Sequence, residues 1–157
     1  MTFRKAVEGT PHLEGAWRAG LGALRTRDRG HIEPSDPRRL QGSVDIDGAL
    51  RNPQPNANRW DFAIGYRHTD REKDCIYWVE IHTAEDKEFK VVLRKMEWLR
   101  TWLTGDGKIL NQFERDFVWV SSGANLLTLG APQLKQLAQL GLQQKTRRLR
   151  IPSQRTH

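Results

Sequence analysis

The sequence predicts an α/β protein with a mixed central sheet and helices on both of its faces. Three observations lead to this fold class. Segments with the two-residue period of strands follow one another between residues 42 and 84, an amphipathic helical segment follows at 85–104, and a continuous apolar run comes at 116–122. A meander of strands that leads through a helical crossover into a buried strand is typical of a mixed sheet. The predicted core order is αβββαβ, with a further helix and strand after it.

The first predicted helix spans residues 10–24. Thr10 is a favourable N-cap and Pro11 suits the first helical position. An apolar face at helical spacing is formed by Leu13, Trp17, Leu21 and Leu24. The polar segment 25–42, which contains Gly30, Pro34 and Pro37, is predicted to be a loop.

Three predicted strands make up the meander, at residues 42–50, 59–68 and 75–84. In an extended chain, neighbouring side chains point to opposite faces. The second strand therefore has one face with Asp61, Ala63 and Gly65 and another with Trp60, Phe62, Ile64 and Tyr66. The third strand places Glu80 and His82 on one face.

The remaining elements begin with the strongest helical pattern of the chain, at 85–104. Its stripe of period 3.6 contains Phe89, Val92, Leu93, Met96, Leu99 and Leu103, and Gly105 ends it. We expect this helix to pack across the sheet face opposite to Glu80 and His82. The run 116–122 is predicted to be a strand covered on both faces. A helix is predicted at 131–145 and an edge strand at 147–151.

Composition and charge suggest one domain over residues 1–157 that ends in a basic tail, 145–157. The formal net charge is +7, and residues 124–157 contain six basic residues and no acidic one. Such a segment favours polyanions, and the residues expected to bind nucleic acid are Lys145, Arg147, Arg148 and Arg150. A solvated, frayed end is the alternative for the last five or so residues. A single cysteine, no apolar run of membrane length and no signal peptide predict a cytoplasmic protein without membrane contact.

The candidate site consists of Asp61, Glu80 and His82. If the second and third strands pair, these side chains converge on one sheet face, which Ala63 and Gly65 would leave open to a metal ion and a phosphate. Two carboxylates suit Mg²⁺ or Mn²⁺, with water and phosphate oxygens as further ligands. A remnant site and an ordinary polar sheet face are the alternatives. The other histidines, His12, His31, His68 and His157, receive no role.

The residues "RWDFAIGY" and "VEIHTA", together with the order of elements over residues 10–130, resemble the PD-(D/E)XK nuclease superfamily. The resemblance implies that Asp61 and Glu80 bind the metal, and that Glu14 in the first helix assists. His82 stands where the family has a lysine that positions or activates water. Asp45 and Asp47 are further accessory candidates. A cation from the next helix could replace the missing lysine, and the candidates are Lys87, Lys90, Arg94 and Lys95.

Two functions follow as predictions. The first is a metal-dependent nuclease-like hydrolase that uses Mg²⁺ or Mn²⁺ on the phosphodiester bonds of DNA or another nucleic acid. The second is a non-catalytic protein of the nuclease fold that binds nucleic acid or a protein partner. The missing lysine and the mildly acidic middle of the chain, residues 41–123, favour the second function.

Overall fold

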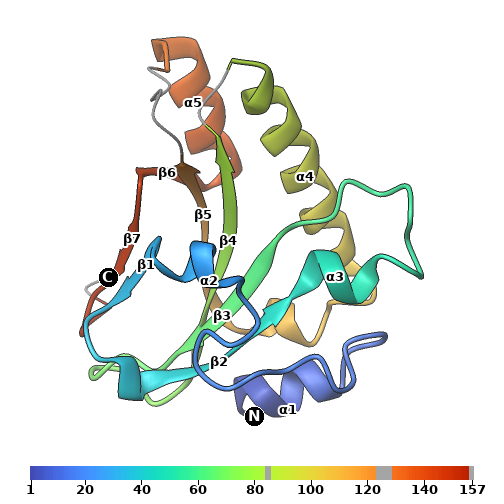
Figure 1. Cartoon of the computed structure of the whole chain (residues 1–157), viewed down its shortest axis with the longest axis vertical. Helices are drawn as coiled ribbons and strands as arrows, with labels where there is room; N and C mark the ends of the chain where they lie inside the picture. The colour runs from blue at the N-terminus through green and yellow to red at the C-terminus, as the bar shows by residue number, and fades with distance from the viewer. Residues whose placement is uncertain (84–85, 123–128, 156–157) are drawn as a thin grey trace.

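The computed structural model describes residues 1–83, 86–122 and 129–155, and its centre is a five-stranded mixed sheet (Figure 1). The strand order is β2-β3-β4-β5-β6, antiparallel from β2 to β4 and parallel from β4 to β6. The α/β class with a mixed sheet is therefore confirmed. The strands are β2 (Leu40–Asp45), β3 (Phe62–Tyr66), β4 (Cys75–Thr83), β5 (Glu114–Ser122) and β6 (Leu142–Thr146).

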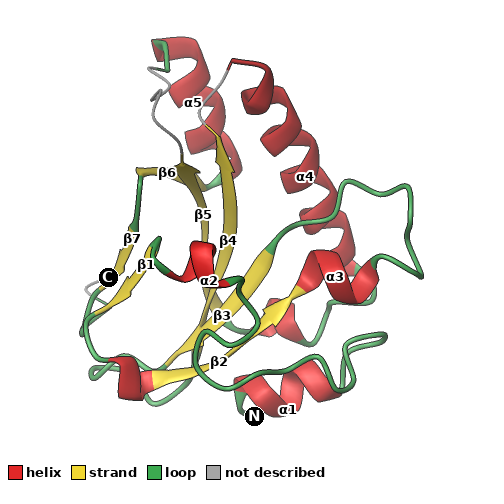
Figure 2. Ribbon diagram, viewed as in Figure 1, coloured by secondary structure: helices red, strands yellow, loops and turns green. Residues whose placement is uncertain are grey.

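Helices cover one face of this sheet, and a small second sheet lies against the other (Figure 2). The first face packs against α1 (Phe3–Glu8), α4 (Asp86–Thr104) and α5 (Ala131–Leu140). The second face packs against Ile32 of β1 (Ile32–Pro34) and Leu149 of β7 (Leu149–Ile151), two parallel strands that lie beside the short helix α2 (Thr26–Arg29). The remaining short elements are α3 (Ile46–Leu50) and the 3₁₀ turns Pro37–Arg39 and Leu110–Gln112.

The long helix α4 lies on the same face as Glu80, so the prediction that it packs across the opposite face is wrong. On β4, Trp78 and Glu80 point to one face, and Trp78 packs in the same core cluster as Met96 of α4. Tyr77 and Val79 point into the other cluster. The alternation along β4 was predicted correctly, but a two-residue period does not say which face a later helix covers.

The helix predicted at residues 10–24 is absent, and the N-terminal helix is α1 instead. The Thr10 hydroxyl donates a hydrogen bond to the carbonyl of Ala6, so it follows the helix rather than starting one. His12 and Gly15 have φ angles of 68° and 76°, in the left-handed region that a right-handed helix excludes. The segment crosses the edge of β2 through a bridge from Arg18 to Ser43.

Two predicted elements change type partway along their length. The strand expected at 42–50 ends at Asp45, because the Asp45 carboxylate accepts a hydrogen bond from the Gly48 amide and starts α3. The helix expected at 131–145 ends at Leu140, and Gly141 with φ 70° turns the chain into β6. A parallel strand after α5 is thus added to the predicted core.

The segment predicted to be a tail, 145–157, is part of the fold as far as residue 155. It contributes to β6 and supplies β7, whose Leu149 and Ile151 are buried. Arg155 then pairs with Asp116 at 3.0 Å and with Glu114 at 2.9 Å. The frayed end was the alternative for the last five or so residues; of these, Arg155 is held by the two ion pairs, and 156–157 lie outside the described residues.

Candidate functional site

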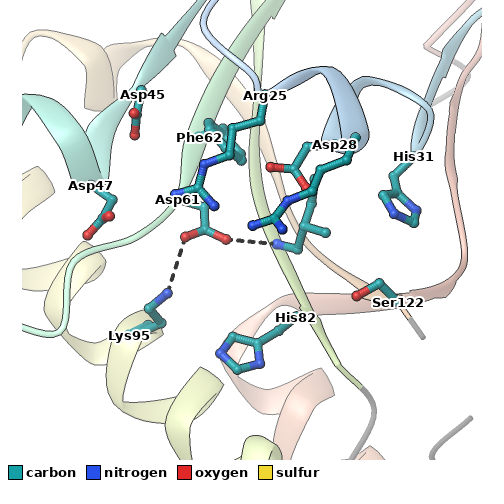
Figure 3. A pocket seen from close by; sticks show the side chains of 12 residues that line it. Arg25, Asp28, His31, Asp45, Asp47, Asp61, Phe62, His82, Lys95 and Ser122 are labelled. Atoms are coloured by element: carbon teal, nitrogen blue, oxygen red, sulfur yellow. Dashed lines mark hydrogen bonds and ion pairs between the residues drawn. The ribbon is translucent and has the colours of Figure 1, made fainter. Parts of the chain in front are cut away.

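A cleft of about 460 Å³ opens at the carboxyl ends of the parallel strands β4 and β5 (Figure 3). Crevices at this end of parallel strands are common ligand sites in α/β proteins. The cleft is lined from both layers of the fold, by Arg25, Arg27, Asp28, His31, Asp45, Asp47, Asp61, Phe62, Ile81, His82, Lys95 and Ser122. We call Asp61, Glu80 and Lys95 the floor of the cleft, and Arg25 and Arg27 its roof.

The floor joins two carboxylates to one ammonium group. Lys95 of α4 places its Nζ 2.5 Å from Glu80 Oε2 and 3.3 Å from Asp61 Oδ1. Glu80 is completely buried in the middle of β4, whereas Asp61 and Lys95 reach the cleft. The predicted convergence of Asp61 and Glu80 is therefore present in the structure, and the cation between them comes from the helix.

Backbone hydrogen bonds hold both carboxylates in place. The Asp61 amide donates to Glu80 Oε1 at 3.1 Å, and the Ile81 amide donates to Asp61 Oδ2 at 3.1 Å. Phe62 and Val79 are the last paired residues of β3 and β4, and Asp61 and Glu80 are the next residue on each side. The two side-chain contacts therefore extend the pairing of these strands. The positions of the two side chains are thus fixed by the sheet itself, which preorganises the floor.

Burial and charge shift the pKa values of the floor. Burial raises the pKa of Glu80 well above its usual range, and the nearby Asp61 carboxylate adds to this, while the Lys95 ammonium opposes it. For Lys95, burial alone would lower the pKa, but the carboxylates of Glu80 and Asp61 outweigh burial and raise it. Lys95 therefore remains charged at neutral pH, and the floor holds a fixed positive charge.

The donor set of the floor fits Mg²⁺ or Mn²⁺ only in part. Within residues 1–83, 86–122 and 129–155, no group of three or more His, Cys, Asp or Glu side chains is arranged to hold a metal ion. Asp61 and Glu80 supply two oxygen-bearing groups, which suffice for an ion that keeps several waters. Because the Lys95 ammonium contacts both groups, it has to move away when a divalent cation binds there.

His82 lies at the wall of the cleft, next to helix α4 (Figure 3). Its Nδ1 is 2.9 Å from Glu88 Oε2, a carboxylate of α4. This contact orients the imidazole at the wall of the cleft. The residue therefore brings a second basic group to the cleft, beside Lys95.

Of the three accessory carboxylates, Asp45 and Asp47 have structural partners of their own, and Glu14 lies away from the cleft. Asp45 lines the cleft, but its side chain caps α3; burial raises its pKa, with the charges of Asp47 and Asp61 adding to the shift. Asp47 pairs with Arg51 and Arg59, each at 3.0 Å. Glu14 is exposed, follows α1 instead of lying in it, and is not among the lining residues of the cleft.

Contrary to the prediction, the small residues of β3 do not open the sheet face to a ligand. Ala63 is fully buried, and a Cβ at Gly65 would lie 2.6 Å from the ring of Phe3 in α1. Gly65 thus makes room for a helix. The cleft lies instead at the end of the sheet, where Asp61 precedes the first residue of β3.

The sequence did not identify the residues that face the floor from the other layer. Arg25, Asp28 and His31 project into the cleft from α2 and its flanks (Figure 3). His31 had been given no role, and the segment was read only as a polar loop. The run "RTRDRGH" is rich in charge, but no spacing along the chain relates it to Asp61. Their proximity depends on the pairing of β1 with β7.

Comparisons with family models, curated proteins and solved structures find no match for this chain. Within the described ranges, no helix combines the length and the apolar character that a membrane crossing requires. The function is therefore inferred from the geometry of the cleft.

Proposed function

We propose that the protein is a metal-dependent hydrolase that acts on phosphodiester bonds of nucleic acid at the floor of the cleft. The observation that carries this proposal is the convergence of Asp61 and Glu80 on one cation position, held by backbone hydrogen bonds. The resemblance of "RWDFAIGY" and "VEIHTA" to the PD-(D/E)XK superfamily supports it.

In this proposal the protein side chains have separate tasks. Asp61 and Glu80 would hold Mg²⁺ or Mn²⁺, which supplies water activation and stabilises charge on phosphate oxygens. Lys95, displaced from between the carboxylates, would stay within reach of the scissile phosphate and take the part of the missing family lysine. His82, oriented by Glu88, would accept or donate a proton at the imidazole.

A second candidate is a non-catalytic protein of the same fold that binds nucleic acid or a protein partner. It is favoured by one specific contact, the 2.5 Å pair between Lys95 and Glu80, in which the ammonium already neutralises the buried carboxylate. In that case Lys95 replaces the metal permanently. The two candidates differ in whether a divalent cation can displace the ammonium.

The test is incubation of plasmid, single-stranded DNA and RNA with the protein in Mg²⁺, Mn²⁺ or chelator. We expect cleavage that requires metal and that is abolished in Asp61→Asn and Glu80→Gln. Asp47→Asn is the matched control, because this carboxylate lines the same cleft but is paired with arginines. His82→Lys should retain or raise the activity. Wild-type inactivity together with rescue by His82→Lys would indicate a degenerate nuclease, and inactivity of both would favour the binding protein.

A further inference from the structure

We infer that a basic track from the mouth of the cleft to the edge strand β6 binds the sugar–phosphate backbone of single-stranded nucleic acid; the inference rests on the proposed function. The track consists of seven exposed side chains, Arg25, Arg27, Arg29, Lys145, Arg147, Arg148 and Arg150. Its two segments, 25–33 and 145–151, contain only Asp28 and Glu33 as acidic residues. A net charge of +5, out of +7 for the chain, is thus carried by 16 residues.

The two segments form one surface because they are joined by hydrogen bonds. The Leu149 amide donates to the carbonyl of His31 at 2.7 Å, and the His31 ring contacts the carbonyl of Arg147 through Nδ1 at 2.5 Å. Parallel pairing of β1 with β7 continues the contact from Ile32 onward. Figure 1 shows α2, β1 and β7 on the same side of the molecule. His31 is therefore the junction between the roof of the cleft and the corner of β6 and β7.

Little of the charge of the track is neutralised within the fold, although Arg29 donates a hydrogen bond to the carbonyl of Leu24. Helix α2 contributes no buried residue to the core, and both Arg25, which precedes it, and Arg27 within it are exposed. Arg148 and Arg150 pair with Glu33, but their side chains remain 53% and 77% exposed. Exposed pairs of this kind add little to stability. A concentrated and poorly neutralised positive surface attracts polyanions through counterion release.

The shape of the cleft and the chemistry of the track indicate the kind of polyanion. A cleft of about 460 Å³ is the size of a small-molecule site, with room for one or two nucleotides and not for a duplex. A hollow of about 280 Å³ at the far end of the track is lined by Lys145, Thr146, Arg148 and Arg150. The two segments of the track, 25–33 and 145–151, contain no Phe, Tyr or Trp on which a base could stack. Phe62 in the cleft is only 5% exposed. Contacts would therefore be made to phosphates, which position a strand without reading its sequence.

The test measures binding in chelator, so that it does not depend on cleavage. Affinity for a mixed-sequence single-stranded oligonucleotide is recorded against salt concentration for the full chain, for Arg25→Gln/Arg27→Gln and for Lys145→Gln/Arg150→Gln. Each pair should reduce the slope of log affinity against log salt by about 1.4, since each phosphate contact to a single strand contributes about 0.7. The control is Lys73→Gln/Lys108→Gln, which removes two exposed charges from loops at the opposite end of β4 and β5.

The expected result is a reduced slope for both track variants and an unchanged slope for the control. The inference is overturned if the control changes as much as the track variants, if Arg25→Gln/Arg27→Gln leaves the slope unchanged, or if a blunt duplex binds as tightly as the single strand. Track-dependent binding of phosphatidylserine vesicles without binding of oligonucleotides would assign the surface to lipid instead. Track-dependent oligonucleotide binding without metal-dependent cleavage would retain the track and reject only the proposed hydrolysis.

Discussion

The floor and the roof of the cleft hold their charges in opposite ways. In the floor, Glu80 is fully buried and Lys95 is only 16% exposed, so each charge depends on the other groups. In the roof, Arg25 and Arg27 are exposed and belong to a segment that adds nothing to the core at α2. Burial makes a charge sensitive to its partners, whereas solvent makes it nearly independent of them. Changes in the floor should therefore alter stability, and changes in the roof should alter binding alone.

The largest loss of stability is expected for Lys95→Met. This substitution leaves Glu80 buried beside Asp61 without a cation, and loss of one member of a buried pair costs about 3–5 kcal/mol. Urea denaturation at pH 7 measures the loss. Lys90→Met is the control, since Lys90 is exposed on the same helix.

A divalent cation distinguishes the two candidate functions in this variant. If Asp61 and Glu80 can hold Mg²⁺ or Mn²⁺, millimolar metal should restore much of the stability that Lys95→Met loses, because the ion binds only the folded state. No restoration by metal would favour the non-catalytic candidate. An unchanged free energy of unfolding in Lys95→Met would contradict the account of the floor itself.

An intermediate loss of stability is expected for substitutions of Asp45, which lies on the border of the cleft. Asp45→Ala removes the cap of α3 and should cost about 1 kcal/mol, whereas Asp45→Asn keeps a hydrogen-bond acceptor for the Gly48 amide and should be nearly neutral in stability. Thermal unfolding compares the two variants. If Asp45→Asn abolishes cleavage at unchanged stability, Asp45 belongs to the catalytic floor rather than to the helix cap alone.

The pH dependence of stability tests the buried carboxyl of Glu80. Its pKa is raised in the folded protein, so its stabilising contribution is complete below the unfolded pKa and is lost as pH rises through the folded value. Wild type should therefore lose stability relative to Glu80→Gln as pH rises above the usual glutamate pKa of about 4.3, at no more than about 1.4 kcal/mol per pH unit. If wild type instead gains stability relative to Glu80→Gln as pH rises, the pKa of Glu80 is lowered in the folded protein.

The smallest effect on stability is expected in the roof. Arg25→Gln/Arg27→Gln should change the free energy of unfolding by no more than about 0.5 kcal/mol, as for other exposed substitutions. The free energy of unfolding is measured by urea denaturation, on the same samples that are used for the binding experiment. A loss of several kcal/mol would mean that the roof is held by contacts like those of the floor.

The local patterns of the sequence were sufficient for much of the sheet and for two of the three residues of the floor. Alternation in "RWDFAIGY" and "YWVEIHTA" placed Asp61 and Glu80 beside one another, and the apolar stripe predicted α4. The same period failed at Trp60, which packs in the cluster of Ala63 and not in that of Phe62, because β3 begins only at residue 62. Alternation applies only where the chain is a regular strand.

The rest of the site depends on contacts between distant residues. Lys95 was one of four cations proposed on the helix, and its selection required the position of α4 over β4. The roof required the pairing of β1 with β7. A strand was predicted at 147–151, which contains β7, but its partner β1 lies in the segment 25–42 that was predicted to be a loop. At residues 10–24 a good apolar spacing was overridden by left-handed backbone at His12 and Gly15. Lys87 was also one of these four cations, and its side chain is not among those that the structure describes.

The pairing of β1 with β7 also has a consequence for the order of events during synthesis on the ribosome. Ile32 emerges early, but its partner Leu149 lies more than a hundred residues later, so the small sheet cannot form on a nascent chain that stops before β7. The carboxylates of the floor, Asp61 directly before β3 and Glu80 in β4, are synthesised much earlier. We expect ribosome-bound chains arrested before residue 149 to be cut by protease at the arginines of segment 25–29, and released chains to resist. Synthesis would thus complete the strands around the floor of the cleft before the two segments of the basic track can join.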